Sequence, residues 1–292
     1  MIIEIDKDSG FCFGVENSIK LAEKELAKGN KLYCLGEIVH NEEENRRLEA
    51  LGVDFIDLNQ FQQLMNAKVL IRAHGEPPST YAIARKNKIE LIDTTCAIVE
   101  RLQHKIVCSY EEMLAKGGQV VVYGNKKHPE VIGLVGQTNG QAKVVSSIQD
   151  LDVIDYSKPV QLFSQTTKSE ADYNAIEKEI KRRLVANGLQ PDLAFKGKNT
   201  ICKQVSKRGP HMKIFAKRFD VILFVTGKQS SNGKMLSETC KSVNKNTYVI
   251  SSVNESEKAW FDGINSVGIT GATSTPVWML EQIADEVRKM FD

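Results

Sequence analysis

The chain has 292 residues, of which 41% are hydrophobic and 26% are charged, as in soluble globular proteins of two or three domains. Lys and Arg number 39 against 37 Asp and Glu, and this net charge of +2 gives no reason to expect a nucleic-acid or membrane partner. The sequence does not open with a basic stretch followed by an apolar core, and no apolar run is as long as a membrane span. We therefore expect a cytoplasmic protein.

Short apolar segments alternate with helical segments along the chain. The expected strands are residues 2–6, 32–35, 69–71, 120–123, 160–163, 221–225 and 267–270. Helices are expected at 15–29, from 42, from the prolines at 77 and 78, from 131, at 169–187, from 234, and at the C-terminal end. Residues 192–200 are expected to form a connector. This alternation predicts parallel α/β layers, and the nearly all-apolar strands predict helices on both faces of each sheet.

The alternation also repeats weakly in threes. Setting the opening strand aside, two strand ends fall in each third of the chain. We therefore predict three α/β domains covering residues 1–96, 97–196 and 197–292.

Polar residues gather where the expected strands end, which is where ligands bind in parallel sheets. They are His40, His74, His128, Glu130, Thr166, Ser230, Ser231, Asn232 and Ser274. Runs of Ser, Thr and Asn at helix starts form anion sites, although the same runs are also ordinary helix caps. Glu130 stands two residues after His128, and beside an anionic ligand its pKa would rise, as suits a general acid. On spacing alone, Glu130 could equally be a charge that favours the start of a helix. His104 and His211 lack such a context and are set aside.

Three of the six cysteines share a context. Cys12 stands within Gly-Phe-Cys-Phe-Gly-Val, Cys96 ends Asp-Thr-Thr-Cys, and Cys202 ends Asn-Thr-Ile-Cys. Each precedes a helical stretch, and a helix N-terminus stabilises the thiolate that binds metal. Cys34, Cys108 and Cys240 lie in apolar or helical segments and are interpreted as buried thiols.

Three thiolates from separate segments are compatible with two kinds of metal centre. They can hold a [4Fe–4S] cluster through three irons, with the fourth iron available as a Lewis acid. They can also hold a zinc ion together with a water molecule, which would be redox-silent. The absence of any Cys-x-x-Cys pair argues against a zinc finger or a ferredoxin-like cluster site. No dinucleotide or Walker motif is present, so no bound nucleotide is expected.

Together these motifs resemble the 4-hydroxy-3-methylbut-2-enyl diphosphate reductase family. The matching segments occur in order along nearly the whole chain: Gly-Phe-Cys-Phe-Gly-Val, Glu-Ile-Val-His-Asn, Ala-His-Gly, Asp-Thr-Thr-Cys, His-Pro-Glu-Val, Ser-Gln-Thr-Thr, Thr-Ile-Cys, Ser-Ser-Asn and Ser-Thr-Pro. Ala97 stands where the family commonly has Pro, and Ser206-Lys207-Arg208-Gly209 replaces a more usual Asn-Arg-Gln. The second departure leaves the loop after Cys202 less well defined.

The resemblance implies a trefoil of three pseudo-repeated α/β domains around a central metal cluster. Cys12, Cys96 and Cys202 would ligate one [4Fe–4S] cluster per chain, with one iron not bound by protein. Glu130 would deliver a proton. The substrate, an allylic diphosphate, would be bound by His40, His74, His128, Thr166, Ser230, Ser231, Asn232 and Ser274. Its allylic hydroxyl would be removed with electrons from a donor such as ferredoxin or flavodoxin, giving isopentenyl and dimethylallyl diphosphate in the last step of the non-mevalonate isoprenoid pathway.

Two other functions compete with this one. A three-domain dehydratase that uses an iron–sulfur cluster held by three cysteines, such as quinolinate synthase, would need no reductant. A metal-free module that binds a small anion would need neither a cluster nor electrons.

Overall fold

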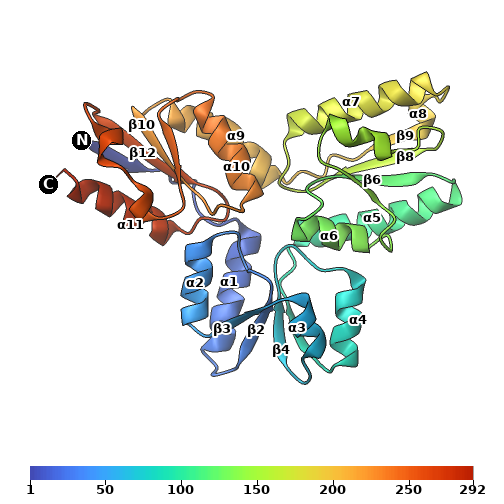
Figure 1. The fold of residues 1–292 in the computed structure, drawn as a ribbon, viewed down its shortest axis with the longest axis horizontal. Coiled ribbons are helices and arrows are strands. Elements are labelled where there is room, and N and C mark those ends of the chain that lie inside the picture. The colour runs from blue at the N-terminus through green and yellow to red at the C-terminus, as the bar shows by residue number, and fades with distance from the viewer. Residues whose placement is uncertain (292) are drawn as a thin grey trace. The chain divides into compact units, whose positions relative to one another are not determined.

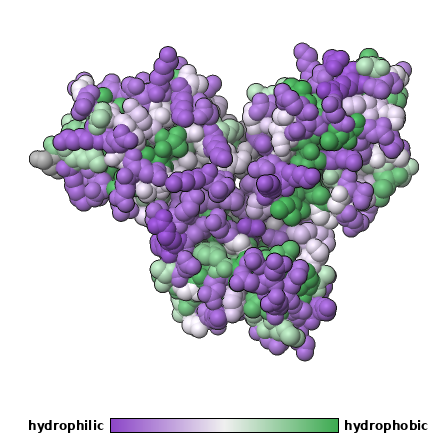
Figure 2. Space-filling view, viewed as in Figure 1, coloured by the Kyte–Doolittle hydropathy of each residue, from purple (hydrophilic) through white to green (hydrophobic). Residues whose placement is uncertain are grey.

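The computed structural model describes residues 1–291 and divides into two compact units. The first unit joins Met1–Phe61 to the segment from Lys203 onward, and the second is Gln62–Cys202. Each unit is an assembly of parallel strands and helices, as Figure 1 shows. Hydrophilic residues predominate on the surface seen in Figure 2, with hydrophobic residues in scattered patches.

The first unit contains a four-stranded parallel sheet in the order β1-β12-β10-β11. Its strands are β1 (Ile2–Ile5), β10 (Val221–Val225), β11 (Thr247–Ile250) and β12 (Ser266–Gly271). The opening strand of the chain therefore pairs with the last strand. Alternate residues of β10 face opposite ways: Leu223 packs with helix α11 (Val277–Lys289), and Phe224 packs with α9 (Lys203–Ala216) and α10 (Ser231–Lys241).

The first unit also holds the helix that follows Cys12 and the segment that carries His40. These elements are α1 (Phe13–Leu26), β2 (Leu32–Leu35), α2 (Glu42–Ala50), β3 (Val53–Ile56) and α3 (Leu58–Gln63), whose last residues pass into the second unit. Strands β2 and β3 pair in parallel, in a register that sets Leu32 against Val53. Two short 3₁₀ helices, Val253–Glu255 and Lys258–Phe261, follow β11.

The second unit contains a sheet of the same kind, in the order β7-β6-β8-β9. Its strands are β6 (Gln119–Tyr123), β7 (Lys143–Val145), β8 (Val160–Ser164) and β9 (Phe195–Gly197). Helices α5 (Ala97–Ala115) and α6 (Pro129–Gly136) cover one face, and α7 (Glu170–Ala186) covers the other (Figure 1). Side chains along β6 again alternate between the two faces of the sheet, because Val121 packs with residues of α7 and Val122 packs with residues of α5.

The second unit also contains elements outside this sheet and its covering helices. The first part holds the parallel pair β4 (Lys68–Ile71) and β5 (Glu90–Asp93), joined by α4 (Pro78–Lys86). A 3₁₀ helix (Ile148–Val153) follows β7, and α8 (Pro191–Ala194) precedes β9.

The fold confirms the predicted class, an α/β protein built on parallel sheets. All seven expected strands are present within a residue or two of their predicted ends. The prediction that residues 192–200 form only a connector was wrong, because they include the edge strand β9. The helix after β10 begins at Ser231 rather than Lys234, because Ser230 caps it. The division at residues 96 and 196 stays a prediction. Within residues 1–291 the helices are too short or too polar to span a bilayer.

Candidate functional site

Each of the three selected cysteines is held by the same backbone hydrogen bond. The N–H of Cys12 donates to Thr273 O (3.1 Å), that of Cys96 to Ala73 O (3.0 Å), and that of Cys202 to Thr166 O (2.9 Å). In every case the acceptor lies two residues beyond the end of the strand that pairs with the strand before the cysteine. The helices α1, α5 and α9 begin at the next residue. The sequence therefore builds one cysteine-bearing turn three times.

The motif before Cys96 and Cys202 explains how this turn is made. Asp93 Oδ1 accepts from the N–H of Thr95 (2.9 Å), and Asn199 Oδ1 accepts from that of Ile201 (3.0 Å). Both are Asx turns, in which a side chain replaces a backbone acceptor two residues away. The following threonines, Thr94 and Thr200, donate their hydroxyls to the last carbonyl of the neighbouring strand, at 2.6 and 2.5 Å. An acid or amide followed by Thr thus fixes the backbone that presents the cysteine.

The turn before Cys12 reaches a similar result with other residues. Asp6 Oδ1 accepts from the N–H of Asp8 (3.1 Å), and Ser9 Oγ accepts from the N–H of Gly271 (3.1 Å). Arg208, from helix α9, donates to the carbonyls of Gly10 (3.0 Å) and Gly271 (3.3 Å). The segment after Cys202 that differs from the family pattern therefore supplies a guanidinium, and this group ties the Cys12 loop to strand β12.

Glu130 forms the chemical centre of the second unit. Its carboxylate is 1% exposed and accepts from the N–H of Thr166 at Oε1 (2.7 Å) and from its hydroxyl at Oε2 (2.6 Å). Burial raises the pKa of Glu130 to about 7, although both hydrogen bonds from Thr166 act in the opposite direction. The desolvation cost therefore leaves a carboxyl group that gains and loses a proton near neutral pH.

The histidine before Glu130 has a defined tautomer. His128 caps helix α6 by accepting the N–H of Glu130 at Nδ1 (3.2 Å), so its neutral ring carries the proton on Nε2. The ring of His74 meets that of His128 edge to face, with centroids 5.2 Å apart. The second unit thus brings His74, His128, Glu130 and Thr166 together at one place.

A matching group of neutral side chains lies in the first unit. Ser230 caps helix α10 by accepting the N–H of Gly233 (3.0 Å), and its hydroxyl also contacts that of Ser274 (3.0 Å). Asn232 donates from Nδ2 to Thr273 Oγ1 (2.7 Å), while its Oδ1 is buried with no partner among the described residues. The serines and Asn232 are at most 8% exposed. The structure therefore brings Ser230, Asn232 and Ser274 together, with Ser231 next to them in α10.

His40 precedes helix α2 and lies against the loop after strand β10. A side chain at Gly227 would meet His40 O at 2.2 Å, so only glycine permits this approach. Asn41 caps α2 by accepting the N–H of Glu44 (3.1 Å). This cap fixes the backbone that carries His40.

The other three cysteines differ in burial, and His211 has acidic neighbours. Cys34 and Cys240 are buried, as predicted. The prediction that Cys108 is buried was wrong: it is exposed, because it lies on the charged side of α5 with Lys105, away from the apolar stripe of Leu102 and Ile106. His211 contacts Asp6 (2.8 Å) and Asp8 (3.3 Å), a context that the sequence did not reveal.

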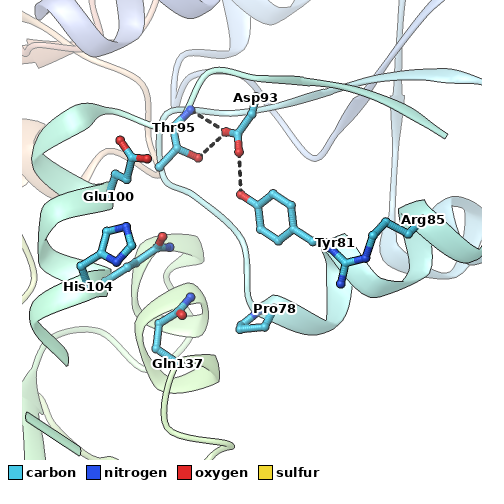
Figure 3. Close-up of a pocket in the computed structure, with 9 residues that line it drawn as sticks. Pro78, Tyr81, Arg85, Asp93, Thr95, Glu100, His104 and Gln137 are labelled. Atoms are coloured by element: carbon cyan, nitrogen blue, oxygen red, sulfur yellow. Dashed lines mark hydrogen bonds between the residues drawn. The ribbon is translucent and has the colours of Figure 1, made fainter. Parts of the chain in front are cut away.

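A cavity of about 520 Å³ lies beside the Cys96 turn, in the second unit. Figure 3 shows His104 on one side, and Tyr81 and Thr95 hydrogen-bonded to Asp93 on the other. None of the residues selected from the sequence lines it. Within the described residues, the cavity therefore shares no lining residue with the group around Glu130.

Two residues that hold these groups in place, Thr273 and Arg208, were not among the site residues selected from the sequence. Thr273 had a usable signal, since it follows β12 as Thr166 follows β8. Arg208 had none, because its acceptors are backbone carbonyls far away in the sequence.

The chain is an α/β protein with polar and thiol side chains beyond the carboxyl ends of its parallel strands. This is where α/β proteins of this kind bind their ligands. Residues 3–288 match the model of the LytB protein family, and the chain belongs to this family. It is 50% identical over 288 residues to the 4-hydroxy-3-methylbut-2-enyl diphosphate reductase of Parabacteroides distasonis, covering 99% of this chain and 98% of that one.

Two solved structures are also similar. One is described as (E)-4-hydroxy-3-methyl-but-2-enyl diphosphate reductase, the terminal enzyme of the non-mevalonate pathway, with 34% identity, a TM-score of 0.70, and coverage of 99% of this chain and 100% of that chain. The other is the E-1-hydroxy-2-methyl-but-2-enyl-4-diphosphate reductase from Plasmodium falciparum, with 25% identity, a TM-score of 0.84, and coverage of 97% and 87%. The similarity spans the whole fold.

Proposed function

We propose that this chain is an enzyme that reductively removes the allylic hydroxyl of 4-hydroxy-3-methylbut-2-enyl diphosphate. The reaction takes up two electrons and two protons and gives isopentenyl or dimethylallyl diphosphate plus water. Family membership supports the substrate, and the observation that carries the chemistry is the buried Glu130 with a pKa of about 7. A hydroxyl group leaves as water only if a proton reaches it, and Glu130 is a proton source at neutral pH.

The cysteines fit an iron–sulfur cluster by their chemistry. Cys12, Cys96 and Cys202 are each partly exposed and stand where a helix begins, and their backbones are held by equivalent hydrogen bonds. Thiolates are the protein ligands that such clusters use. These three residues would hold one [4Fe–4S] cluster per chain and leave one iron without a protein ligand. When bound, the cluster supplies single electrons and a Lewis-acidic iron.

Glu130 and Thr166 form a proton relay in this proposal. The Thr166 hydroxyl lies 2.6 Å from Oε2, so it accepts a proton from the neutral carboxyl and donates its own onward. The N–H of Thr166 holds the other carboxylate oxygen at 2.7 Å, which fixes the orientation of the acid. The same threonine also accepts the N–H of Cys202 at its carbonyl. The acid is thereby anchored to a cysteine-bearing turn.

The diphosphate would be bound by neutral donors rather than by a clamp of Lys and Arg. His128 carries its proton on Nε2 in the neutral ring, and Ser230, Ser274 and Asn232 contribute hydroxyl and amide groups. His40, His74, Thr166 and Ser231 complete the proposed set of substrate-binding residues. Binding at this remote end would orient the hydroxyl for reaction. The electron donor would be a ferredoxin or flavodoxin of the cytoplasm.

The test uses protein purified without oxygen, analysed for iron and sulfide, and given the substrate with dithionite and methyl viologen. We expect about four irons and four sulfides per chain and formation of both isoprenoid diphosphates. Cys12→Ser should lower the iron content and abolish turnover, while Cys240→Ser, at a buried site outside the cysteine turns, should retain both. A colourless zinc protein, or a cluster protein with no reductant-dependent product, would overturn the proposal.

A further inference from the structure

Helix α5 and strand β9 of the second unit share a strongly basic surface. Arg101, Lys105, Cys108 and Glu112 lie at helical spacing on one side of α5. Lys196 of β9 approaches Glu112 from the sheet side (3.9 Å), and Lys198 Nζ contacts Ser109 Oγ of α5 (3.2 Å). We name Arg101, Lys105, Lys196 and Lys198 the cationic face.

The charge of the cationic face is not neutralised by its surroundings. The acid beside it, Glu112, forms a closer ion pair with Lys116 (2.8 Å). Arg101 and Lys105 are exposed and have no ion pair with any residue of the part of the chain that the structure describes. The pKa of Lys198 is lowered, first by partial burial and then by the charge of Lys196. Like charges are therefore crowded on this surface, as on surfaces that meet an anionic partner.

Each part of the cationic face lies a short way along the chain from a proposed cluster ligand. Arg101 and Lys105 come five and nine residues after Cys96, or about 7 and 13 Å along the helix axis. Lys198 comes four residues before Cys202, at most about 14 Å away along an extended chain. A protein bound there would lie close to the turns that present Cys96 and Cys202.

We propose that the cationic face is the docking surface for a small acidic electron-transfer protein that reduces this enzyme. The inference rests on the proposed function, since a reductase needs electrons from outside. Acidic carboxylates on the partner would complement four basic side chains, steer its approach, and give the small, short-lived interface that electron-transfer complexes use. Nothing in this arrangement calls for a deep apolar pocket.

The test variant is Arg101→Glu/Lys105→Glu, at two exposed positions of one helix. The matched control is Lys143→Glu/Lys178→Glu, which makes the same charge change on β7 and on α7, the helix across the sheet from α5. Turnover is measured at low salt with a reduced acidic ferredoxin or flavodoxin at varied concentration. It is then measured again with dithionite and methyl viologen.

We expect the test variant to raise the KM for the acidic donor about tenfold or more, because surface charges set the association rate. The viologen-driven rate should stay unchanged, and the control should match the wild type in both assays. An unchanged KM, or an equal rise in the control, would overturn the docking surface. The docking surface would also be overturned if Arg101→Glu/Lys105→Glu abolished the binding of single-stranded RNA but left the binding of the donor unchanged.

Failure of the proposed function gives a different result. Wild-type protein would then show no viologen-driven turnover. Direct binding of the acidic donor to wild type and to Arg101→Glu/Lys105→Glu, measured by calorimetry, still decides the docking surface: loss of binding in the variant supports it, and equal binding overturns it.

Discussion

The two units place different chemistry at the same position of the same scaffold. Strand β6 ends at Tyr123 and Glu130 comes seven residues later; β10 ends at Val225 and Asn232 comes seven residues later. Both are the second residue of a helix. Glu130 bonds to Thr166, two residues beyond β8, and Asn232 bonds to Thr273, two residues beyond β12. A carboxyl group and its neutral counterpart thus occupy equivalent sites.

The difference separates proton transfer from binding. Both side chains are nearly fully buried and hydrogen-bonded to a threonine, so geometry alone does not distinguish them. Glutamate at such a site can exchange a proton near pH 7, whereas asparagine cannot ionise. A repeated fold can therefore supply one acid and one neutral anchor by changing one side chain.

The largest effect is expected from Glu130→Gln, which makes the second unit resemble the first. Turnover should fall by roughly 10² to 10⁴, the usual contribution of a general acid, with substrate affinity retained. Steady-state kinetics with a chemical reductant measure both quantities. Glu44→Gln, at another buried carboxylate outside the group around Glu130, is the control and should keep kcat. An unchanged rate in Glu130→Gln would mean that Glu130 only favours its helix start.

The pH dependence sharpens the same prediction. Because the neutral acid is the active form, wild-type kcat should fall as pH rises through about 7. The raised pKa also means that the folded state binds this proton more tightly than the unfolded state. Hence wild type should lose up to about 3 kcal/mol of unfolding free energy, relative to Glu130→Gln, between about pH 4.5 and 7. Denaturant titrations of both proteins at several pH values measure this difference.

A smaller effect is expected from Asn232→Asp, the reverse exchange. A carboxylate at this 4% exposed site would face the proposed diphosphate with a like charge, so KM for the substrate should rise about ten- to a hundredfold while kcat changes less. Thr239→Val, further along helix α10, is the control for a change in the stability of this helix. If Asn232→Asp leaves KM unaltered, Asn232 does not hold the anionic end of the substrate.

Much of this comparison was visible in the sequence. The strand ends, the three cysteine contexts and the group that includes Glu130 could be predicted, because apolar strands and helix-start residues leave local patterns. Five strands were missed, and all lie at the edge of a sheet: β3, β5, β7, β9 and β11. They have only three or four residues each, and segments such as Glu-Leu-Ile-Asp and Phe-Lys-Gly are too polar to signal a strand. The raised pKa of Glu130 could not be predicted in magnitude, because it depends on how completely distant segments bury the carboxyl group.

The smallest expected effect concerns the scaffold beneath the comparison. Thr200→Val removes the hydroxyl that bonds to Ser164 on both sides, donating to its carbonyl (2.5 Å) and accepting its N–H (2.8 Å). We expect a loss of about 1–3 kcal/mol in unfolding free energy, because a buried backbone group is left without a partner. Asn199→Ala, which opens the Asx turn at a more exposed position, should cost less. Denaturant unfolding of the two variants measures the order. If Asn199→Ala costs more than Thr200→Val, the Asx turn rather than the threonine holds the Cys202 loop, and the turns before Cys96 and Cys202 are then fixed chiefly by their first residue.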